Sequence, residues 1–150
     1  MKPKTISIAA AALASGLLFS ISQIAGVHAD DRHKRGCSNK TLKGSYGNYR
    51  TGNSPAGPLA AVGHHTFDGN GNSTGVGNTS RNGTYTFDVE IVGTYEVAED
   101  CTGKFIDPAT GNEVSRIVVV DDGKEIYGLS VTADAAVYGV WKKIHNDRDR

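Results

Sequence analysis

The adjacent histidines His64 and His65 are the first residues whose chemistry could serve a ligand, a metal ion or a proton transfer. Neighbouring residues of a β-strand point to opposite faces, so both imidazoles cannot bind one metal ion. We therefore expect one histidine to face the interior or a rim and the other to face water. The pair has three interpretations: a structural or solvated role, contact with a ligand or proton transfer, and binding of a metal ion.

Any further chemistry would depend on polar side chains that line the interior of a barrel. The candidates for contact with a ligand are Tyr46, His65, Tyr95 and Glu96. The chain has no recognisable Ser-His-Asp arrangement, phosphate loop or nucleotide fingerprint. We therefore assign no catalytic residue and expect no cofactor.

The segment Asp68-Gly69-Asn70-Gly71-Asn72 has oxygen-bearing side chains at alternate positions, as at the start of a calcium loop. An EF-hand needs a glycine at its sixth position and a carboxylate at its twelfth, where this chain has Ser73 and Thr79. The segment is therefore interpreted as a hairpin turn, and no metal site is expected.

The chain has two cysteines, Cys37 and Cys101. An even pair without C-x-x-C spacing is typical of a structural disulfide in an oxidising compartment. Closing a loop of roughly 65 residues would stabilise the fold by roughly 4 kcal/mol in the chain-entropy model. We predict that the two cysteines are linked and that the domain is tied together from Cys37 onward.

The amino terminus is typical of a secretory signal peptide at 1–29. Lys2 and Lys4 precede an apolar run at about 6–21, and a more polar stretch ends at Ala29. This order predicts cleavage before Asp30 and export by the general secretory route, to the periplasm or outside the cell. The apolar run is shorter than the ~20 residues that span a bilayer, so we expect no membrane span after cleavage.

The charge of the chain is balanced, with a formal net charge of zero, and cleavage would remove two lysines and no acid. This balance gives no electrostatic reason to expect nucleic acid or an anionic membrane as a partner. Residues 30–36 are interpreted as a flexible basic leader and 145–150 as a disordered charged tail. The sequence leaves the oligomeric state open.

Residues 37–144 alternate short β-branched and aromatic runs with turns rich in Gly, Asn and Asp, a spacing typical of a sandwich or barrel. The predicted strands are at about 41–50, 60–67, 73–80, 84–92, 93–98, 101–106, 113–121, 124–132 and 136–144. We expect two of these runs to form one strand through Gly93, which leaves about eight. Short turns require consecutive strands to pair antiparallel, so the predicted fold is an all-β meander.

The sequence also predicts that the sheet closes into a barrel. Glycines recur inside the strands and mark bends that let a small sheet curl, which favours a barrel over a sandwich. In a closed barrel, strand 41–50 pairs with strand 136–144. An aromatic cluster is then expected at this seam, formed by Tyr46, Tyr49, Tyr138 and Trp141.

Strand 84–92 has the period-two pattern of one buried and one exposed face. Its apolar residues alternate with polar ones and are predicted to be buried together: Tyr85, Phe87, Val89 and Ile91.

Five short segments carry a resemblance: CSNKTLKGSYG at 37–47, VG at 62–63, TFDGNGN at 66–72, GTYEV at 93–97 and DCTG at 100–103. They resemble a group of small, exported, mostly uncharacterised bacterial proteins, whose barrel is similar to the lipocalin-like (calycin) and allene oxide cyclase-like families. The resemblance covers 37–144 and implies a cup that takes a small apolar molecule. No position matches the site pattern of the cyclases, and Gly44-Ser45-Tyr46 replaces the lipocalin Gly-x-Trp signature.

Three functions are compatible with these features. The first is non-catalytic binding of a small apolar or amphipathic molecule inside an exported barrel. The second is a structural or adhesive surface protein whose barrel is filled by side chains. The third is a barrel enzyme of cyclase or isomerase type. The volume of the barrel interior separates the filled barrel from the other two.

Overall fold

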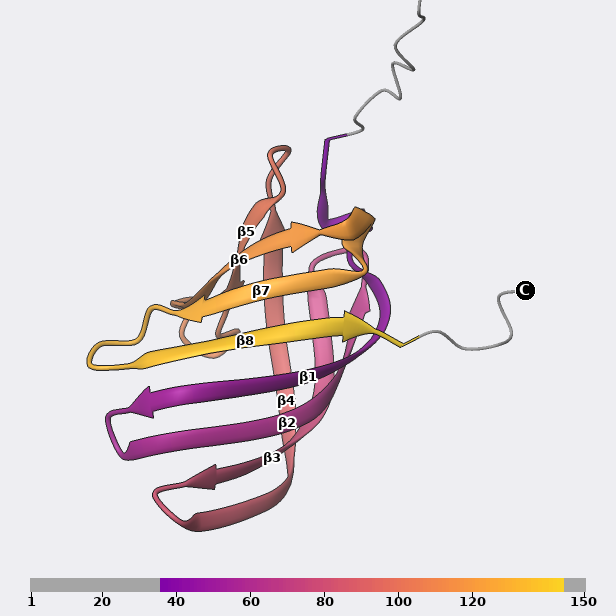
Figure 1. Cartoon of the computed structure of the whole chain (residues 1–150). Coiled ribbons are helices and arrows are strands. Elements are labelled where there is room, and N and C mark those ends of the chain that lie inside the picture. Colours follow the sequence, from indigo (N-terminus) through magenta and orange to yellow (C-terminus); the bar gives the residue numbers. More distant parts are fainter. Residues whose placement is uncertain (1–35, 145–150) are drawn as a thin grey trace, which may run out of the picture. The chain divides into compact units, whose positions relative to one another are not determined.

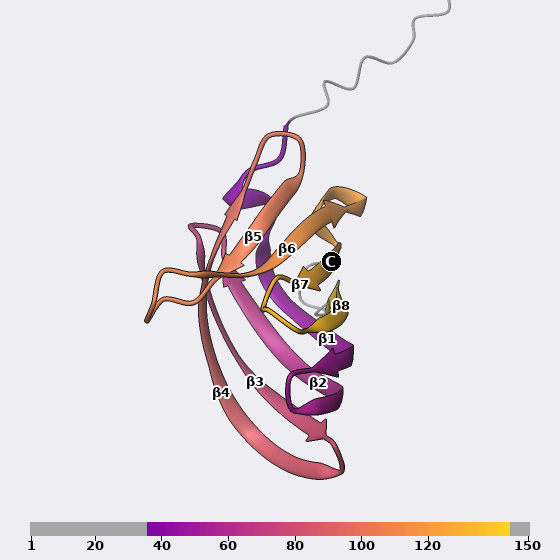
Figure 2. The same cartoon turned by 90° about the vertical axis from the view of Figure 1, so that its left-hand side faces the viewer.

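The computed structural model describes residues 36–144, which form a closed barrel of eight antiparallel strands in meander order (Figures 1 and 2). The elements are η1 (Asn39–Thr41), β1 (Lys43–Ser54), β2 (Gly57–Asp68), β3 (Asn72–Arg81), β4 (Thr84–Val97), β5 (Thr102–Ile106), β6 (Glu113–Val120), η2 (Asp121–Gly123), β7 (Glu125–Ser130) and β8 (Ala136–Lys143). The predicted all-β meander is confirmed, and the two runs that meet near Gly93 form the single strand β4.

The signal peptide, its cleavage site, most of the basic leader and the charged tail lie outside the described residues. Between residues 36 and 144, no helix is long and apolar enough to cross a bilayer.

The seam between β1 and β8 closes the barrel, as predicted. The two strands pair from Tyr46 opposite Lys143 to Asn53 opposite Ala136. Each remaining strand pairs with its neighbours in the sequence, so the sheet forms a ring. The turns at 55–56, 82–83, 107–112 and 131–135 lie at one end of this ring, which we call the mouth, and the start of β1 and the end of β8 lie at the other end.

The expected aromatic cluster at the seam is wrong, because its four members divide between two faces. Tyr46 and Trp141 are buried inside the barrel, whereas Tyr49 and Tyr138 are about half exposed on its outer face. Side chains alternate along a strand, so residues three apart, such as Tyr46 and Tyr49, point in opposite directions.

The aromatic cluster that does form is centred on Phe67 of β2. The rings of Tyr46 and Tyr95 meet the Phe67 ring edge-to-face, at centroid distances of 5.1 and 5.2 Å. Phe105 stacks on Phe67 at 5.9 Å and contacts Trp141 at 5.2 Å. Aromatic rings prefer such offset and edge-to-face geometries. The rest of the core packs around these rings: Leu42, Ile117, Val119 and Ile126.

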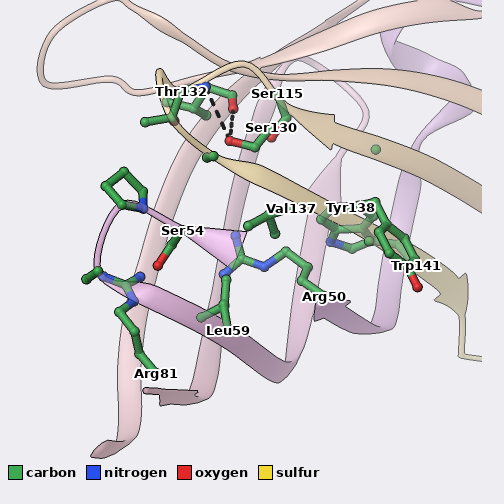
Figure 3. Close-up of a pocket in the computed structure, with 16 residues that line it drawn as sticks. Arg50, Ser54, Leu59, Arg81, Ser115, Ser130, Thr132, Val137, Tyr138 and Trp141 are labelled. Carbon is green, nitrogen blue, oxygen red and sulfur yellow. Dashed lines mark hydrogen bonds between the residues drawn. The ribbon is translucent and has the colours of Figure 1, made fainter. Parts of the chain in front are cut away.

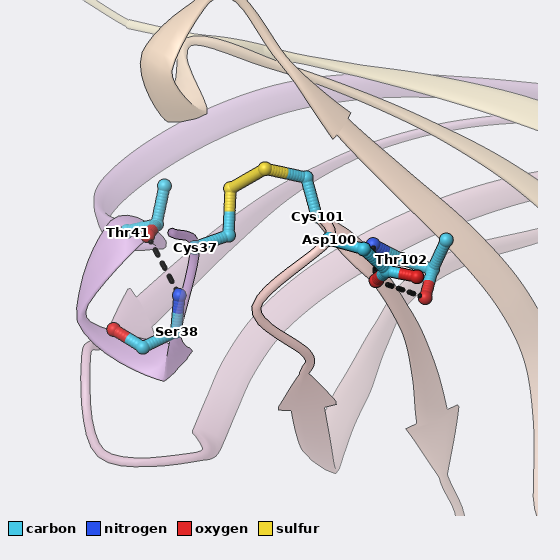
Figure 4. The surroundings of a disulfide bond; sticks show 6 residues. All are labelled: Cys37, Ser38, Thr41, Asp100, Cys101 and Thr102. Atoms are coloured by element: carbon cyan, nitrogen blue, oxygen red, sulfur yellow. Dashed lines mark hydrogen bonds between the residues drawn. A yellow bond between two sulfur atoms is a disulfide. The ribbon is translucent and has the colours of Figure 1, made fainter. Parts of the chain in front are cut away.

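The end of the barrel opposite the mouth is closed by the segment that precedes β1. Cys37 and Cys101 form the predicted disulfide, with their Cα atoms 4.9 Å apart (Figure 4). The Cys37 N–H donates to the Glu99 carbonyl at 3.0 Å, and the Val97 N–H donates to Asn39 Oδ1 at 2.8 Å. A covalent bond and two hydrogen bonds therefore hold this segment on the turn between β4 and β5.

A β-bulge interrupts β4. Thr86 pairs with Thr79 and Val89 with Gly77, so Phe87 and Asp88 together oppose the single residue Asn78. Asp88 has a φ of 53°, and its N–H, which leaves the ladder, donates to Asn78 Oδ1 at 2.9 Å. An extra residue in one strand shifts the alternation of its side chains. Odd-numbered residues therefore point outward before the bulge and inward after it.

The bulge makes the predicted burial of Tyr85 and Phe87 wrong. These two residues lie on the outer face, 67% and 70% exposed, and their rings stack at 6.4 Å. Beyond the bulge, Ile91 is only partly exposed and lines the interior, whereas Val89, which was also predicted to be buried, is 41% exposed. One continuous alternation in the sequence therefore corresponds to two opposite faces in the structure.

The wall of the barrel is incomplete between β4 and β5. β4 pairs with β5 only from Thr94 opposite Ile106 to Val97 opposite Gly103. Figure 1 shows β4 continuing past the end of β5 towards the mouth. The first half of β4 therefore has a free edge, on which the bulge at Asp88 and the charge of Glu90 disfavour pairing with other chains.

Trp141 provides a test of the closed barrel. Its side chain is 3% exposed, so Trp141→Ala leaves a cavity and should lower the free energy of unfolding by about 3 kcal/mol or more. Tyr138→Ala, on the same strand at a position 53% exposed, should cost less than about 1 kcal/mol. Chemical denaturation followed by far-UV circular dichroism measures both. Equal costs for the two variants would contradict the buried position of Trp141.

Candidate functional site: a cavity at the mouth of the barrel

A cavity of about 400 Å³ lies inside the barrel at its mouth, a volume typical of small-molecule sites (Figure 3). Both apolar and polar side chains line it: Arg50, Leu59, Arg81, Ser115, Val137 and Trp141. We call this space the mouth cavity. Because Tyr46, Phe67 and Tyr95 fill the opposite half of the barrel, the barrel has the form of a cup.

A pair of glycines forms part of the cavity wall. Gly128 of β7 lies opposite Gly139 of β8. A Cβ atom on Gly128 would lie 2.8 Å from Trp141 Cζ3, and one on Gly139 would lie 3.2 Å from Trp141 Cη2. The indole therefore lies directly against the backbone of both strands, and larger residues at the two positions would displace it.

A second space of about 190 Å³, the inner chamber, adjoins the mouth cavity. Arg50, Ser115 and Trp141 line both spaces. The inner chamber is also lined by His65 and by residues of β4 and β5, next to the gap in the wall. A ligand in the mouth cavity could therefore extend one group into the inner chamber.

Arg50 lies at the junction of the two spaces. It shares the inward face of β1 with Tyr46 and Asn48, since the three alternate along the strand. Burial, and then the positive charge of Arg81, lower the pKa of Arg50. Within residues 36–144, every ion pair joins other residues, so neither arginine has a carboxylate partner there.

Four buried polar atoms have no hydrogen-bond partner among the described residues: Asn48 Oδ1, Arg50 Nε, His65 Nε2 and Trp141 Nε1. The side chains of the last three line the inner chamber. A buried polar group without a partner costs on the order of 1–3 kcal/mol. Most buried polar groups in native proteins are paired, so a cluster of unpaired ones is typical of a binding site. A ligand with suitable polar groups can satisfy them.

His65 faces the inner chamber and His64 faces solvent, as the alternation along the strand predicts. Burial, then the charges of Arg50 and His64, lower the pKa of His65 from 6.5 to about 4. His65 is therefore neutral at physiological pH, and only its neutral imidazole is compatible with the nearby Arg50.

Tyr46 and Tyr95, two of the predicted ligand contacts, lie at the closed end. The Tyr46 hydroxyl donates to the Gly123 carbonyl, and burial, followed by Tyr95, raises the pKa of Tyr46 to about 12. The Tyr95 hydroxyl accepts from the Gly69 N–H at 3.0 Å and donates to the Leu42 carbonyl at 2.9 Å. These hydroxyls hold turns in place, at the opposite end of the barrel from the mouth cavity.

Glu96, the fourth predicted contact, lies on the outer face of the barrel. Its carboxylate is 2.9 Å from the ammonium group of Lys104 on β5. Adjacent strand residues alternate between faces, so Glu96 points outward because Tyr95 points inward. The structure places Tyr46 and Tyr95 together, His65 next to the cavity and Glu96 outside.

The sequence analysis did not identify Arg50 or Arg81 as site residues. The available signal was strand phase, because Arg50 lies four residues after the inward Tyr46 on one strand. Arg81 ends β3, where it lines the mouth cavity opposite the same β2 face that carries Leu59. An arginine on a buried face of a strand is rare unless it is paired, which makes it a functional signal.

The Asp68 segment forms the turn between β2 and β3. The Asp68 carboxylate accepts from the N–H groups of Asn70 and Asn72 and from the Asn72 amide. These bonds, the Asn72 side chain first, lower the pKa of Asp68 to about 2. Across residues 36–144, no group of three or more His, Cys, Asp or Glu side chains could hold a metal ion.

The fold and the cavity together define a small β-barrel that is closed at one end and hollow at the other. No protein-family model matches the chain, and neither curated proteins nor solved structures give a significant match.

The low pKa of His65 predicts a pH-dependent stability. Below pH 6.5 the unfolded chain binds a proton at this histidine that the folded chain rejects until about pH 4, so stability falls as pH falls through this window. The loss should reach about 3 kcal/mol at pH 4. Urea denaturation across this range measures it. His65→Gln should flatten the profile and His64→Gln should not, whereas equal slopes in wild type and His65→Gln would contradict the buried neutral imidazole.

Proposed function

We propose that this protein binds a small amphipathic molecule in the mouth cavity, without catalysing its conversion. The observation that carries the proposal is a hollow of about 400 Å³ with apolar walls and a few convergent polar groups, the usual form of a ligand pocket. Its continuation into the inner chamber gives room for a ligand with distinct polar and apolar parts.

The distribution of side-chain size supports binding over a filled barrel. At the closed end, inward positions carry large residues such as Tyr46, Phe67 and Ile126. At the mouth, inward positions of β6, β7 and β8 carry Ser115, Gly128, Ser130 and Gly139. Protein interiors pack closely, so small residues gathered at one end leave usable space there.

The titratable groups at the cavity support binding over catalysis. A general base works best when its pKa lies near the working pH. Burial lowers the pKa of His65 to about 4, so its imidazole is a weak base at neutral pH. Glu96, the acid among the predicted contacts, is paired with Lys104 on the outer face.

We further propose that the protein acts in an exported compartment, the periplasm or the extracellular space. The Cys37–Cys101 disulfide is compatible with an oxidising compartment. As part of the same proposal, the barrel resembles calycin-like barrels and holds an apolar molecule in its cup, as that resemblance implies.

An adhesive surface is a second candidate function, supported by one feature of the outer wall. The exposed rings of Tyr85 and Phe87 line a mainly apolar groove of about 340 Å³ with Tyr49 and Val62. Exposed apolar patches of this kind often contact other molecules. Binding there would not use the barrel interior.

Titration with the neutral fluorescent probe N-phenylnaphthylamine tests the proposed function. Ser115 lines both spaces, so Ser115→Leu fills part of each and should weaken probe binding by about tenfold or more. The matched control is Val118→Leu, because Val118 lies three residues further along β6 and is exposed on the outer face. It should bind the probe as wild type does.

Two outcomes would contradict binding in the cavity. One is the absence of any saturable binding to wild type, and the other is equal binding by Ser115→Leu and wild type. If Phe87→Ser removes the binding and Ser115→Leu does not, the outer groove is the binding surface and the second candidate function is correct.

A further inference from the structure

Two arginines, Arg50 and Arg81, line the mouth cavity, and no acidic residue among the described ones lines it with them. We propose that its natural ligand carries a carboxylate and that Arg50, assisted by Arg81, binds this group. The proposal rests on the proposed function and specifies the chemical class of the ligand. It is argued from the hydrogen-bonding groups, the charges and the shape of the two spaces.

The unpartnered groups are mainly donors. Arg50 Nε and Trp141 Nε1 can donate hydrogen bonds but cannot accept them. His65 Nε2 can also donate when its imidazole carries the proton on that nitrogen. The complementary ligand group is therefore an acceptor with several lone pairs, which describes a carboxylate.

The charges point to the same ligand. The positive charge of Arg81 is close enough to lower the pKa of Arg50, which means that the two guanidinium groups repel each other. An anion between them would replace this repulsion with two attractions. Charge-assisted hydrogen bonds from a guanidinium to a carboxylate are about twice as strong as neutral ones, and the planar fork of arginine fits both carboxylate oxygens.

Asp107, the acidic residue that lines the inner chamber, already accepts hydrogen bonds from its own turn. Asp107 lines the inner chamber, but its oxygens accept from the Ala109 N–H at 2.9 Å and the Thr110 hydroxyl at 2.9 Å. These bonds stabilise the Asp107 carboxylate and lower its pKa, and they hold it in the turn after β5. Asp107 forms no ion pair with Arg50, although both line the inner chamber.

Arg50 is more buried than Arg81, which favours Arg50 as the residue that binds the carboxylate. Arg81 ends β3 and is exposed, so water solvates its charge. Arg50 lies in the middle of an interior face, with Trp141 beside it in both spaces and its Nε atom buried. A partly buried cation in such surroundings lowers stability unless it is paired, so its presence there is explained by a ligand.

The shape of the site orients the ligand. A carboxylate at Arg50 would lie at the junction of the two spaces, next to Trp141, which lines both, and with His65 on the inner side. The apolar part would extend through the mouth cavity along Leu59 and Val137. A medium-chain fatty acid or an aromatic acid has this form.

A matched pair of ligands tests the proposal in wild-type protein. Decanoate and decanol share an apolar chain and differ in the charge of the polar end. Isothermal titration calorimetry at neutral pH should show that decanoate binds about tenfold or more tightly than decanol, the difference that one charge-assisted hydrogen bond supplies.

Three variants then locate the carboxylate. Arg50→Gln should remove the preference for decanoate, so that this variant binds decanoate and decanol with about equal affinity. Arg81→Gln should reduce the preference by about threefold, since an exposed charge contributes less. Arg116→Gln is the control: Arg116 lies on the outer face, paired with Glu113, and the preference should remain. Thermal unfolding of each variant shows whether it is folded.

The outcomes separate this proposal from the proposed function. If decanol binds as tightly as decanoate, or if Arg50→Gln keeps the preference, the carboxylate proposal is wrong and binding in the cavity stands. If neither ligand binds and the neutral probe does not bind either, both are wrong. A tenfold preference for decanoate that Arg50→Gln removes would establish the carboxylate site.

Discussion

The pairing of β1 with β8 is the constraint on which the rest of the structure depends. β1 carries Tyr46 at the closed end and Arg50 at the mouth, and β8 carries Trp141 between them. These side chains share one interior only because the seam joins the two strands. In an open sheet both strands would be edges, and the polar face of β1 would lie in water. The disulfide supports the seam, since it holds the segment before β1 against the turn after β4.

The two halves of the barrel contribute differently to the stability of the protein. The closed half buries the rings of Tyr46, Phe67 and Tyr95, and its two tyrosine hydroxyls are hydrogen-bonded, so it contributes to stability. The mouth half has glycines where packing residues could be, and two buried polar atoms that border it, Arg50 Nε and Trp141 Nε1, have no hydrogen-bond partner among the described residues. Such atoms lower the stability of the empty protein. Proteins commonly accept local instability of this kind at functional sites, and the disulfide and the aromatic cluster provide the stability that offsets it.

Turn chemistry and hydrophobic alternation were sufficient to predict the strands, their order and the closure of the barrel, because short turns and alternation are local properties. It was harder to predict which face of the sheet a side chain points to, where a single extra residue decides this. Asp88 shifts the phase of β4, and nothing in the alternation around Phe87 shows the shift. Among the site candidates, His65 lies beside the cavity, whereas Glu96 lies on the outer face, paired with Lys104. Arg50 was missed because a charged residue in a strand is ordinarily assigned to the solvent face.

The bulge in β4 determines the parity of that strand, that is, whether odd or even positions point inward. Removal of one residue at this point would turn Tyr85 and Phe87 to the inner face of β4, the face on which Thr84 and Thr86 now lie. Insertion or deletion of a single codon would thus exchange an aromatic exterior for an aromatic interior without altering any other residue. In related chains, the length of this segment would therefore be more informative about the size of the cavity than the identity of its residues.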